Sequence, residues 1–488
     1  MARNILILVI GCLLGCTTSA TEPTQKKDTL YRAVTDSITP ALAYEKELDR
    51  SFTLKERMAF YNVPGISIAV INEGEIVWAE GFGNLNNTGD HPVTDSTLFQ
   101  AASISKPVAA TVALQMVHEG LIDLDADINT YLDSWRLDWN DDNSKNPVSL
   151  RHLLSHTGGL TVHGFPGYPV GTNLPELTEI LDGSGNSNTQ RVEVQFEPGS
   201  TIQYSGGGYT IMQQMMMDIS GHPFPKIMED NLLSPLGMKN SSYDQQFPNS
   251  RDRSFATAHI MGEPVTGNYH TYPEKAAAGL WTTPKDLAQW ILSLQNGLNN
   301  NPVSPVDSTV VADMITRQIA GYGLGPQIQG SDTSLRFRHA GSNHGYQADM
   351  VGYANKGKGA VVMTNSDTGS RLINEVIQRI ADYYDWPDYP DIRQTGYISM
   401  SSEQLESFTG TYRLPHQPGI DIEITLQNDQ LYLNHPQTGP QPLFAKDEEE
   451  FFAPFIQLNH IKFIESGGAV EEMRIGPSGR QEVLQKVD

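Results

Sequence analysis

Ser103 and Lys106 are the first residues whose types and spacing could carry out chemistry. They stand three positions apart in the run FQAASISKPVAA, residues 99–110, which contains no acidic residue. On a helix, positions i and i+3 share a face, so the hydroxyl and the amine would lie about one turn apart. A serine hydroxyl becomes a good nucleophile only when a base removes its proton. The pattern therefore suggests a serine nucleophile with a lysine partner.

Lys106 could act as that base only if its amine is uncharged, which requires burial or nearby cations to lower its pKa. If a helix begins near Ser103, the backbone N–H of this residue has no partner within the helix and could donate to a developing oxyanion. A chain of this length contains about one or two Ser-x-x-Lys patterns by chance, so a surface coincidence remains an alternative at this point. The neighbouring residues are small and apolar: Ala101, Ala102, Val108 and Ala109.

Further motifs follow this pair in order along the chain. They are SLRHLLSHTGGL (149–160), FEPGSTIQYSGGGY (196–209), SPLGM (234–238), AAAGLWTTPKDLAQW (276–290), YGLG (322–325) and HAGSNHGYQADMVGY (339–353). Together they resemble the serine β-lactamase-related family, which contains class C β-lactamases, D,D-carboxypeptidase-type penicillin-binding proteins, D-aminopeptidases and esterases. The resemblance covers roughly residues 45–385. The C-terminal part resembles the lipocalin-like β-domain that many members carry.

The resemblance assigns roles to residues in three motifs. It implies that Ser103 is the acylated nucleophile and that Lys106 is its base. Tyr204, in Tyr204-Ser205-Gly206, would relay protons to the leaving group and from water. An aromatic residue in a glycine-rich turn is the structural alternative for Tyr204.

The third motif, His339-Ala340-Gly341, stands where β-lactamases carry Lys-Thr-Gly. The resemblance implies that His339 contacts the substrate and that Gly341 lets the substrate lie against the strand edge. The backbone N–H of Ser342 would be the second oxyanion donor, beside that of Ser103. A purely structural histidine at a strand edge is the alternative for His339.

Two departures from the family pattern concern the substrate. Gly206 replaces an asparagine, which removes a side-chain amide that contacts the acyl amide of the substrate. His339 replaces a lysine, so the positive charge offered to a substrate carboxylate becomes weaker and dependent on pH. Both departures disfavour an efficient β-lactamase. Three other residues are interpreted as structural, His156, Phe451 and Phe452, and His344 is left unassigned.

Composition excludes several classes of protein. The 488 residues carry a formal net charge of −24, which argues against binding to nucleic acid or to an anionic lipid surface. The chain has no Gly-x-Ser-x-Gly elbow, no His-Glu-x-x-His and no cysteine cluster, so an α/β-hydrolase or a zinc peptidase is not indicated. No metal and no organic cofactor is expected.

The first residues, MARNILILVIGCLLGC, have the form of a secretory signal whose apolar run is too short to span a bilayer. The run ends in a sequence that resembles the bacterial lipobox, which predicts a signal peptide over 1–15 and lipid attachment at Cys16. Ordinary cleavage after Thr18-Ser19-Ala20 is the alternative. We expect an exported protein on the periplasmic face of the envelope, anchored by its lipid, with the outer membrane favoured.

Periodicity predicts the elements that must position these residues. Residues 63–83 read as a β-hairpin, 284–297 and 371–384 as helices, and 336–365 as two strands joined by a Gly/Lys turn. A Pro-rich segment, 386–396, marks a domain boundary. The predicted division is a tether over 16–44, a hydrolase domain over 45–388 and a β-domain over 396–488.

The predicted fold class is α+β. It has an antiparallel sheet flanked by helices, an all-helical subdomain that the resemblance implies, and a small all-β barrel or sandwich at the end. The barrel strands are expected at 420–426, 430–434, 450–455 and 460–465.

The leading hypothesis is an envelope serine hydrolase that works through an acyl-enzyme on Ser103. Its substrates would be small peptides or amides with a D-residue at the scissile bond, or carboxylic esters. A weak β-lactamase and a non-catalytic penicillin- or peptidoglycan-binding lipoprotein are the alternatives. The membrane would be contacted only through the N-terminal lipid, and no nucleic acid is expected as a partner. The sequence leaves the oligomeric state and the role of the β-domain open.

Overall fold

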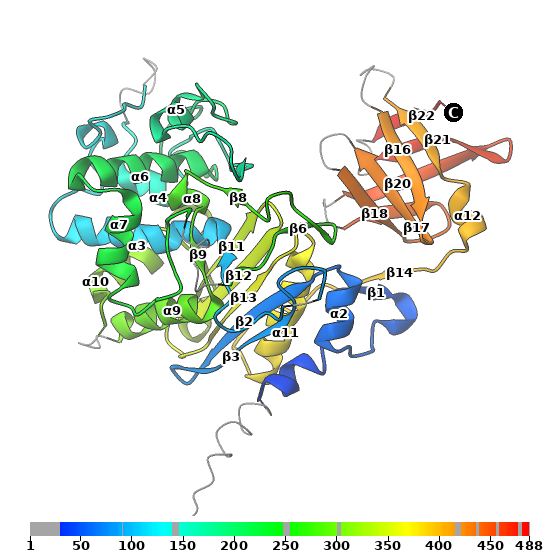
Figure 1. Cartoon of the computed structure of the whole chain (residues 1–488), viewed down its shortest axis with the longest axis horizontal. Helices are drawn as coiled ribbons and strands as arrows, with labels where there is room; N and C mark the ends of the chain where they lie inside the picture. The colour runs from blue at the N-terminus through cyan, green and yellow to red at the C-terminus, as the bar shows by residue number, and fades with distance from the viewer. Residues whose placement is uncertain are drawn as a thin grey trace, which may run out of the picture.

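The structure is a computed structural model and describes residues 30–89, 91–138, 146–246, 254–299, 304–414, 421–435, 439–454, 458–476 and 481–487. It consists of a larger body, in which helices and a sheet pack together, and a smaller barrel at the C-terminal end (Figure 1). The expected signal peptide and the expected lipid-attachment residue Cys16 lie outside the described residues.

A six-stranded antiparallel sheet forms the centre of the larger body. Its strands follow the order β10-β11-β12-β13-β2-β3, and every neighbouring pair is antiparallel. Their bounds are β2 Gly65–Asn72, β3 Glu75–Gly83, β10 Gln327–Gln329, β11 Arg336–Asn343, β12 Tyr346–Tyr353 and β13 Gly359–Thr364.

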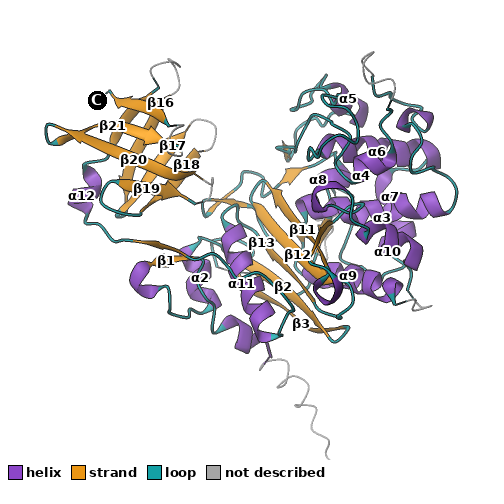
Figure 2. Cartoon of the chain, turned by 180° about the vertical axis from the view of Figure 1, so that it is seen from behind, coloured by secondary structure: helices purple, strands orange, loops and turns teal. Residues whose placement is uncertain are grey.

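Hydrophobic packing covers both faces of this sheet. Along β2, Ala69 and Ile71 belong to one hydrophobic cluster, whereas Ile68 and Val70 belong to another, as the alternation of a strand requires. Helix α9 (Pro284–Leu298) packs on the first face, and α11 (Gly369–Tyr383) packs on the second (Figure 2). A sheet buried on both faces has near-continuous apolar strands, which explains why β13 is fully buried.

Most other helices gather on the α9 side of the sheet and form the helical part that the resemblance implied (Figure 1). The α-helices of this part are α3 Ser105–His118, α4 Leu150–Leu154, α5 Leu177–Asp182, α6 Gly206–Ser220, α7 Phe224–Met228, α8 Lys275–Ala278 and α10 Ser308–Ile315. Its 3-10 turns are η2 Ala102–Ile104, η3 Ile128–Thr130, η6 Ile319–Gly321 and η7 Asp332–Ser334, and a π-helical turn, η4, covers Glu229–Leu233. Short strand pairs join these helices: β4 Phe99–Gln100 with β9 Trp281–Thr282, β5 Tyr168–Pro169 with β8 His270–Thr271, and β6 His259–Ile260 with β7 Glu263–Pro264.

The structure confirms the predicted hairpin and helices, and it corrects one strand assignment. Residues 336–365 form three strands rather than two, because a tight turn at His344 and Gly345 separates β11 from β12. Gly345 has a φ of 77°, a conformation that glycine adopts readily. The two-residue turn at His344 and Gly345 was harder to recognise in the sequence than the longer Gly/Lys turn between β12 and β13.

The C-terminal domain is a closed antiparallel barrel of eight strands. The sequence predicted four of them and left open whether they form a barrel or a sandwich. The strands are β15 Gly410–Arg413, β16 Asp421–Gln427, β17 Gln430–His435, β18 Gly439–Ala445, β19 Glu450–Ala453, β20 Leu458–Ser466, β21 Ala469–Ile475 and β22 Glu482–Lys486. Helix α12 (Ser402–Glu406) precedes the first strand.

The barrel is attached to the larger body by a strand pair and by aromatic packing. Strand β1 (Leu42–Tyr44), followed by the turn η1 (Glu45–Glu47), pairs in parallel with β14 (Thr395–Tyr397). The rings of Phe444 and Phe452 from the barrel join the hydrophobic cluster that also contains α11 and α2 (Leu54–Phe60). Phe451 and Phe452 are both buried, as expected of core residues.

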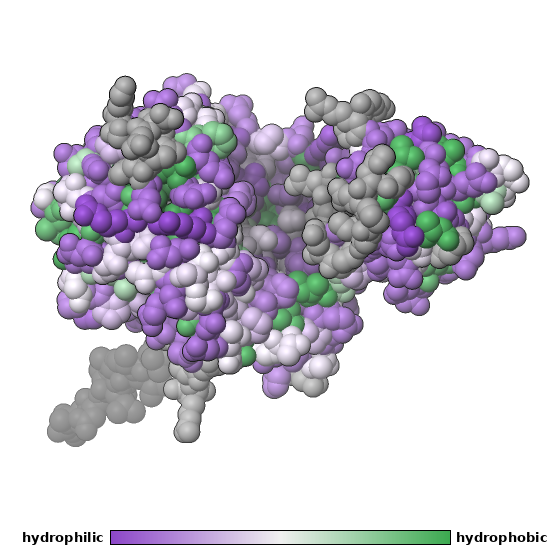
Figure 3. All heavy atoms as spheres, turned by 90° about the horizontal axis from the view of Figure 1, so that it is seen from above, coloured by the Kyte–Doolittle hydropathy of each residue, from purple (hydrophilic) through white to green (hydrophobic). Residues whose placement is uncertain are grey.

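The surface is mainly hydrophilic on the face seen in Figure 3, and its hydrophobic residues gather in small groups. No helix among the described residues is long and apolar enough to cross a membrane.

Candidate active site

Ser103 lies in the turn η2, directly between β4 and α3. A hydrogen bond from the Ala101 N–H to the Leu280 carbonyl (2.9 Å) and the pairing of β4 with β9 fix the start of this turn. The Leu280 N–H in turn donates to the Ser105 hydroxyl at 3.0 Å. The predicted helix start near Ser103 is therefore present, in the form of a 3-10 turn that continues into α3.

The residue before the serine has an unusual backbone conformation. Ala102 has a φ of 49°, in the left-handed region that non-glycine residues seldom occupy. Such strain persists only where the surrounding structure enforces it, and it is concentrated at functional sites. It presents Ser103 from a sharp bend rather than from a regular helix.

Lys106 lies beside Ser103 and is buried. Its Nζ donates to the Ser103 Oγ at 3.1 Å and to the Ala277 carbonyl at 2.8 Å, and only 2% of the residue is exposed. Burial lowers the pKa of the lysine to about 7, and in the part of the chain that the structure describes no carboxylate opposes that effect. At neutral pH, a substantial share of Lys106 is therefore uncharged and able to accept a proton.

Tyr204 completes the group around the lysine. The Lys106 Nζ lies 5.0 Å from the centre of the Tyr204 ring, so the three residues that the sequence singled out meet in one place. Burial raises the pKa of the phenol, and the Ser103 hydroxyl, as its hydrogen-bond partner, acts in the opposite direction. Tyr204 is thus a neutral phenol that can pass a proton without holding a charge.

His156 supports Tyr204, a role that the sequence analysis did not assign. The two rings lie 4.2 Å apart, and the His156 Nδ1 accepts the Ser205 N–H at 3.2 Å. Burial lowers the pKa of this histidine well below its usual value, so it is neutral. His156 also has a positive φ of 57°. In the sequence, the position of His156 in the motif LLSHTGGL was the only indication that it lies at the site.

His339 also lies at the site, and its burial changes the interpretation of its charge. Its ring centre is 6.3 Å from that of Tyr204, and its Nδ1 lies 2.6 Å from the Ala340 carbonyl. Burial lowers the pKa of His339 to about 3, with the Lys106 charge acting in the same direction. The expected pH-dependent positive charge is therefore absent near neutral pH, and the Nε2, which has no partner among the described residues, is left as an acceptor.

The strand edge at Gly341 and Ser342 faces the turn that carries Ser103. Strand β10 pairs with β11 only over Arg336–Arg338, so the later part of β11 has no strand neighbour on that side among the described residues. A Cβ on Gly341 would lie 2.2 Å from the Ala101 carbonyl oxygen, so only glycine allows this close approach. The close approach places the edge of β11 against the residues just before Ser103, and the role of the Ser342 N–H as second oxyanion donor stays a prediction.

His344, which the sequence left unassigned, lies on the turn after this edge. Its N–H donates to the Tyr272 hydroxyl at 3.0 Å, and its ring stacks on that of His270 at 4.1 Å. Both contacts are structural.

Glu274 is a buried acid that the sequence analysis did not identify. It stands directly before α8, the helix whose Ala277 carbonyl binds Lys106, and it is completely buried. Neither carboxyl oxygen has a hydrogen-bond partner among the described residues, and burial raises the pKa of the acid to about 8. Glu274 is therefore mainly protonated at neutral pH and adds no negative charge beside the lysine.

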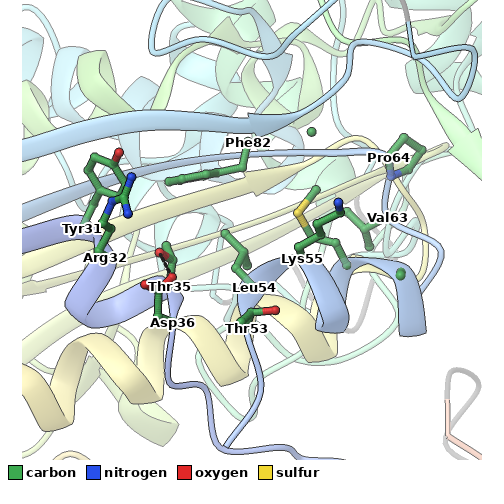
Figure 4. A pocket seen from close by; sticks show the side chains of 13 residues that line it. Tyr31, Arg32, Thr35, Asp36, Thr53, Leu54, Lys55, Val63, Pro64 and Phe82 are labelled. Atoms are coloured by element: carbon green, nitrogen blue, oxygen red, sulfur yellow. Dashed lines mark hydrogen bonds between the residues drawn. The ribbon is translucent and has the colours of Figure 1, made fainter. Parts of the chain in front are cut away.

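A cavity of about 590 Å³ lies on another part of the larger body. Tyr31 and Arg32 lie at one end of it, and Val63 and Pro64 at the other (Figure 4). Ser103, Lys106 and Tyr204 do not line this cavity. It is therefore separate from the candidate active site.

Known proteins resemble this chain over most of its length. The Beta-lactamase family model matches residues 53–384. The chain is 22% identical to penicillin-binding protein 4* of Bacillus subtilis over 405 residues, which is 78% of this chain and 85% of that protein. It is 24% identical to a D-aminopeptidase of Gluconobacter oxydans over 373 residues, which is 74% of this chain and 65% of that protein.

The fold is shared with solved structures. That of the octameric penicillin-binding protein homologue from Pyrococcus abyssi superposes with a TM-score of 0.57 at 22% identity, covering 88% of this chain and 98% of that one. The match of the family model to most of the chain shows its membership. The chain belongs to the β-lactamase family, and it is a serine hydrolase of that family.

Proposed function

We propose that this chain hydrolyses small amides, peptides or esters through an acyl-enzyme on Ser103, with Lys106 as base and Tyr204 as proton relay. One observation carries the proposal. A buried lysine with a pKa of about 7 donates a hydrogen bond to a serine that lies on a strained turn. Few structural roles require an amine to be held in this state beside a hydroxyl.

The geometry supports the following sequence of steps. The neutral Lys106 accepts the hydroxyl proton as the Ser103 Oγ attacks the substrate carbonyl. The resulting oxyanion would receive hydrogen bonds from the backbone N–H groups of Ser103 and Ser342. When the intermediate collapses, the Lys106 proton passes through Tyr204 to the leaving group. In the second half, the same groups remove a proton from water as it attacks the acyl-enzyme.

The proposed substrate is an amide or peptide with a D-residue at the scissile bond, or a carboxylic ester. The likeness to a penicillin-binding protein and to a D-aminopeptidase supports this choice. The neutral His339 and the glycine at position 206 both remove groups that would favour a β-lactam, so β-lactamase activity is expected to be weak. We propose that the protein works in the bacterial envelope, tethered by a lipid on Cys16.

Turnover of a chromogenic ester and of D-amino-acid amides, with Ser103→Ala as a control, tests the proposal. Activity in the wild type that is lost in Ser103→Ala is the expected result. A fluorescent penicillin distinguishes the alternative, because covalent labelling without release would indicate a binding protein. Absence of both turnover and labelling by the folded wild type would overturn the proposal.

A further inference from the structure

The position two residues after Tyr204 differs from the pattern of related sequences in a way that the structure explains. Gly206 is the first residue of α6, and its φ is not in the left-handed region. The backbone there could therefore accept any L-residue, and glycine is not required for its conformation. Some other feature must keep a side chain away from this position.

That feature is the aromatic ring of Phe165. A Cβ built on Gly206 would lie 2.8 Å from Cε2 and 3.3 Å from Cδ2 of this ring, and 3.2 Å from the His163 carbonyl oxygen. The first distance is shorter than carbon atoms tolerate, so a side chain and the ring cannot both be present without movement. Phe165 thus occupies the space that the Cβ of an asparagine at position 206 would need.

The segment that carries Phe165 is held firmly against α6. The Gly206 and Gly207 N–H groups donate to the carbonyls of His163 (3.0 Å) and Val162 (3.1 Å), and the Ser205 hydroxyl donates to the Thr161 carbonyl (2.7 Å). Val162 has a φ of 60°, which is strained for a β-branched residue. Three hydrogen bonds across a strained turn therefore fix the backbone of residues 161–163, which leads directly to Phe165.

The same segment reaches Tyr204 and carries exposed apolar side chains further along. The His163 ring centre is 4.9 Å from that of Tyr204, which places the segment next to the proposed relay. Val170 and Leu174, further along, are 44% and 36% exposed. A substrate group that lies between Tyr204 and the start of α6 would therefore meet the Phe165 ring and no side-chain amide at position 206.

We infer that Phe165 is a specificity-determining residue that selects substrates with an apolar acyl group and rejects those with an acylated amide beside the scissile carbonyl. This inference rests on the proposed function. A secondary amide placed against the ring would lose its hydrogen bonds to water and gain none, which costs free energy. Simple esters with an apolar acyl chain are thus favoured over N-acylated peptides and penicillins.

Two esters with the same leaving group test the inference. In p-nitrophenyl N-acetylglycinate and p-nitrophenyl pentanoate the acyl chains have equal length, but only the first contains a secondary amide. The measured quantity is the ratio of their kcat/KM values in each variant, which cancels the intrinsic reactivity of the esters. Phe165→Ala should shift this ratio about tenfold toward the N-acetylglycinate ester, whereas Phe165→Leu should preserve it. The half-exposed Phe196 provides a matched control, because Phe196→Ala should leave the ratio unchanged.

A pair of variants tests the steric argument separately. Gly206→Asn alone should lose activity on both esters, because the new side chain meets Phe165. The double variant Phe165→Ala with Gly206→Asn should recover activity and favour the N-acetylglycinate ester further. An unchanged ratio in Phe165→Ala, with turnover retained, would overturn the inference and leave the proposed function standing. Absence of ester turnover in the folded wild type would overturn both.

Discussion

The reaction site and the C-terminal barrel differ in the types of residue that adopt a strained, positive φ. Three residues with positive φ and a side chain lie at or next to the site: Ala102, His156 and Val162. In the described part of the barrel, the residues of this kind are Asn428 and Asp429, which form the tight turn between β16 and β17. Asn and Asp tolerate this conformation in turns, whereas Ala and Val do not.

The side chains that fill the two regions also differ. At the site, the Nε2 atoms of His156 and His339 are buried without a hydrogen-bond partner among the described residues. The barrel core is built from aromatic contacts, such as the ring of Phe463 against those of Phe408 and Phe451. The site thus carries strain on residues that tolerate it poorly, whereas the strain in the described part of the barrel lies on turn residues. The predictions below test this division.

Removal of the lysine amine should have the largest effect. Lys106→Met keeps most of the side-chain volume but removes the base, so ester turnover should fall at least about a thousandfold, while the thermal unfolding temperature stays the same or rises. The adjacent helix α8 supplies a control, since Lys275→Met also removes a partly buried lysine and should leave kcat near the wild-type value. Retained activity in Lys106→Met would remove this residue as the base.

Truncation in the barrel should affect stability and spare catalysis. Phe463 is 1% exposed and its ring contacts those of Phe408, Phe451 and Tyr412, so Phe463→Ala should destabilise the barrel by about 3–5 kcal/mol. Denaturant unfolding measures this loss. The value of kcat, assayed where the barrel of the variant is still folded, should not change. A fall in kcat under those conditions would show that the barrel is part of the site.

The pH dependence of catalysis should follow Lys106. Because the base must be neutral and its pKa is about 7, kcat/KM should rise about tenfold per pH unit below pH 7 and level off above it. His339, with a pKa of about 3, titrates far below this range and should not contribute. A rate that stays flat from pH 5 to 7 would contradict the assigned role of the lysine.

The pH dependence of stability should report on Glu274. Burial raises the pKa of this acid from 4.5 to about 8, so between these values the folded state binds more protons than the unfolded state. Stability therefore falls as pH rises through this window, by at most about 1.4 kcal/mol per pH unit.

Glu274→Gln should remove that contribution, so the difference in unfolding free energy between variant and wild type should grow with pH from 4.5 to 8. Tyr168, Tyr272 and Lys275 also face this carboxyl group and are unchanged in the variant. A constant difference across the window would show that the acid is ionised in the folded protein.

Much of the fold followed from local sequence patterns. The hairpin over 63–83 was predictable because Glu73-Gly74, with φ values of 54° and 79°, supplies the two-residue turn between apolar runs. The helix at Pro284 was predictable from its punctuation, and the structure places it over Pro284–Leu298. Strands β15, β18, β21 and β22 were missed because their apolar residues alternate weakly, and closure of the barrel brings them together.

The candidate site was predictable only in part. Ser103, Lys106 and Tyr204 were identified from motifs. Their contact depends on the tertiary structure, which the motifs alone do not specify. The neutral state of His339 depends on complete burial, which no local pattern encodes. Phe165 was not identified, because its relation to Gly206 depends on a strained turn between segments far apart in the sequence.

The pairing of β1 with β14 ties the front of the chain to the segment that leads into the barrel (Figure 1). The carboxylate of Glu375 strengthens this connection, since it accepts hydrogen bonds from the Ala41 N–H (2.6 Å) and from the buried Arg57. A lipid anchor upstream of this strand would therefore pull on the junction of the two domains rather than on a loose end. The orientation of the reaction site relative to a membrane would then depend on this junction, which also holds the barrel.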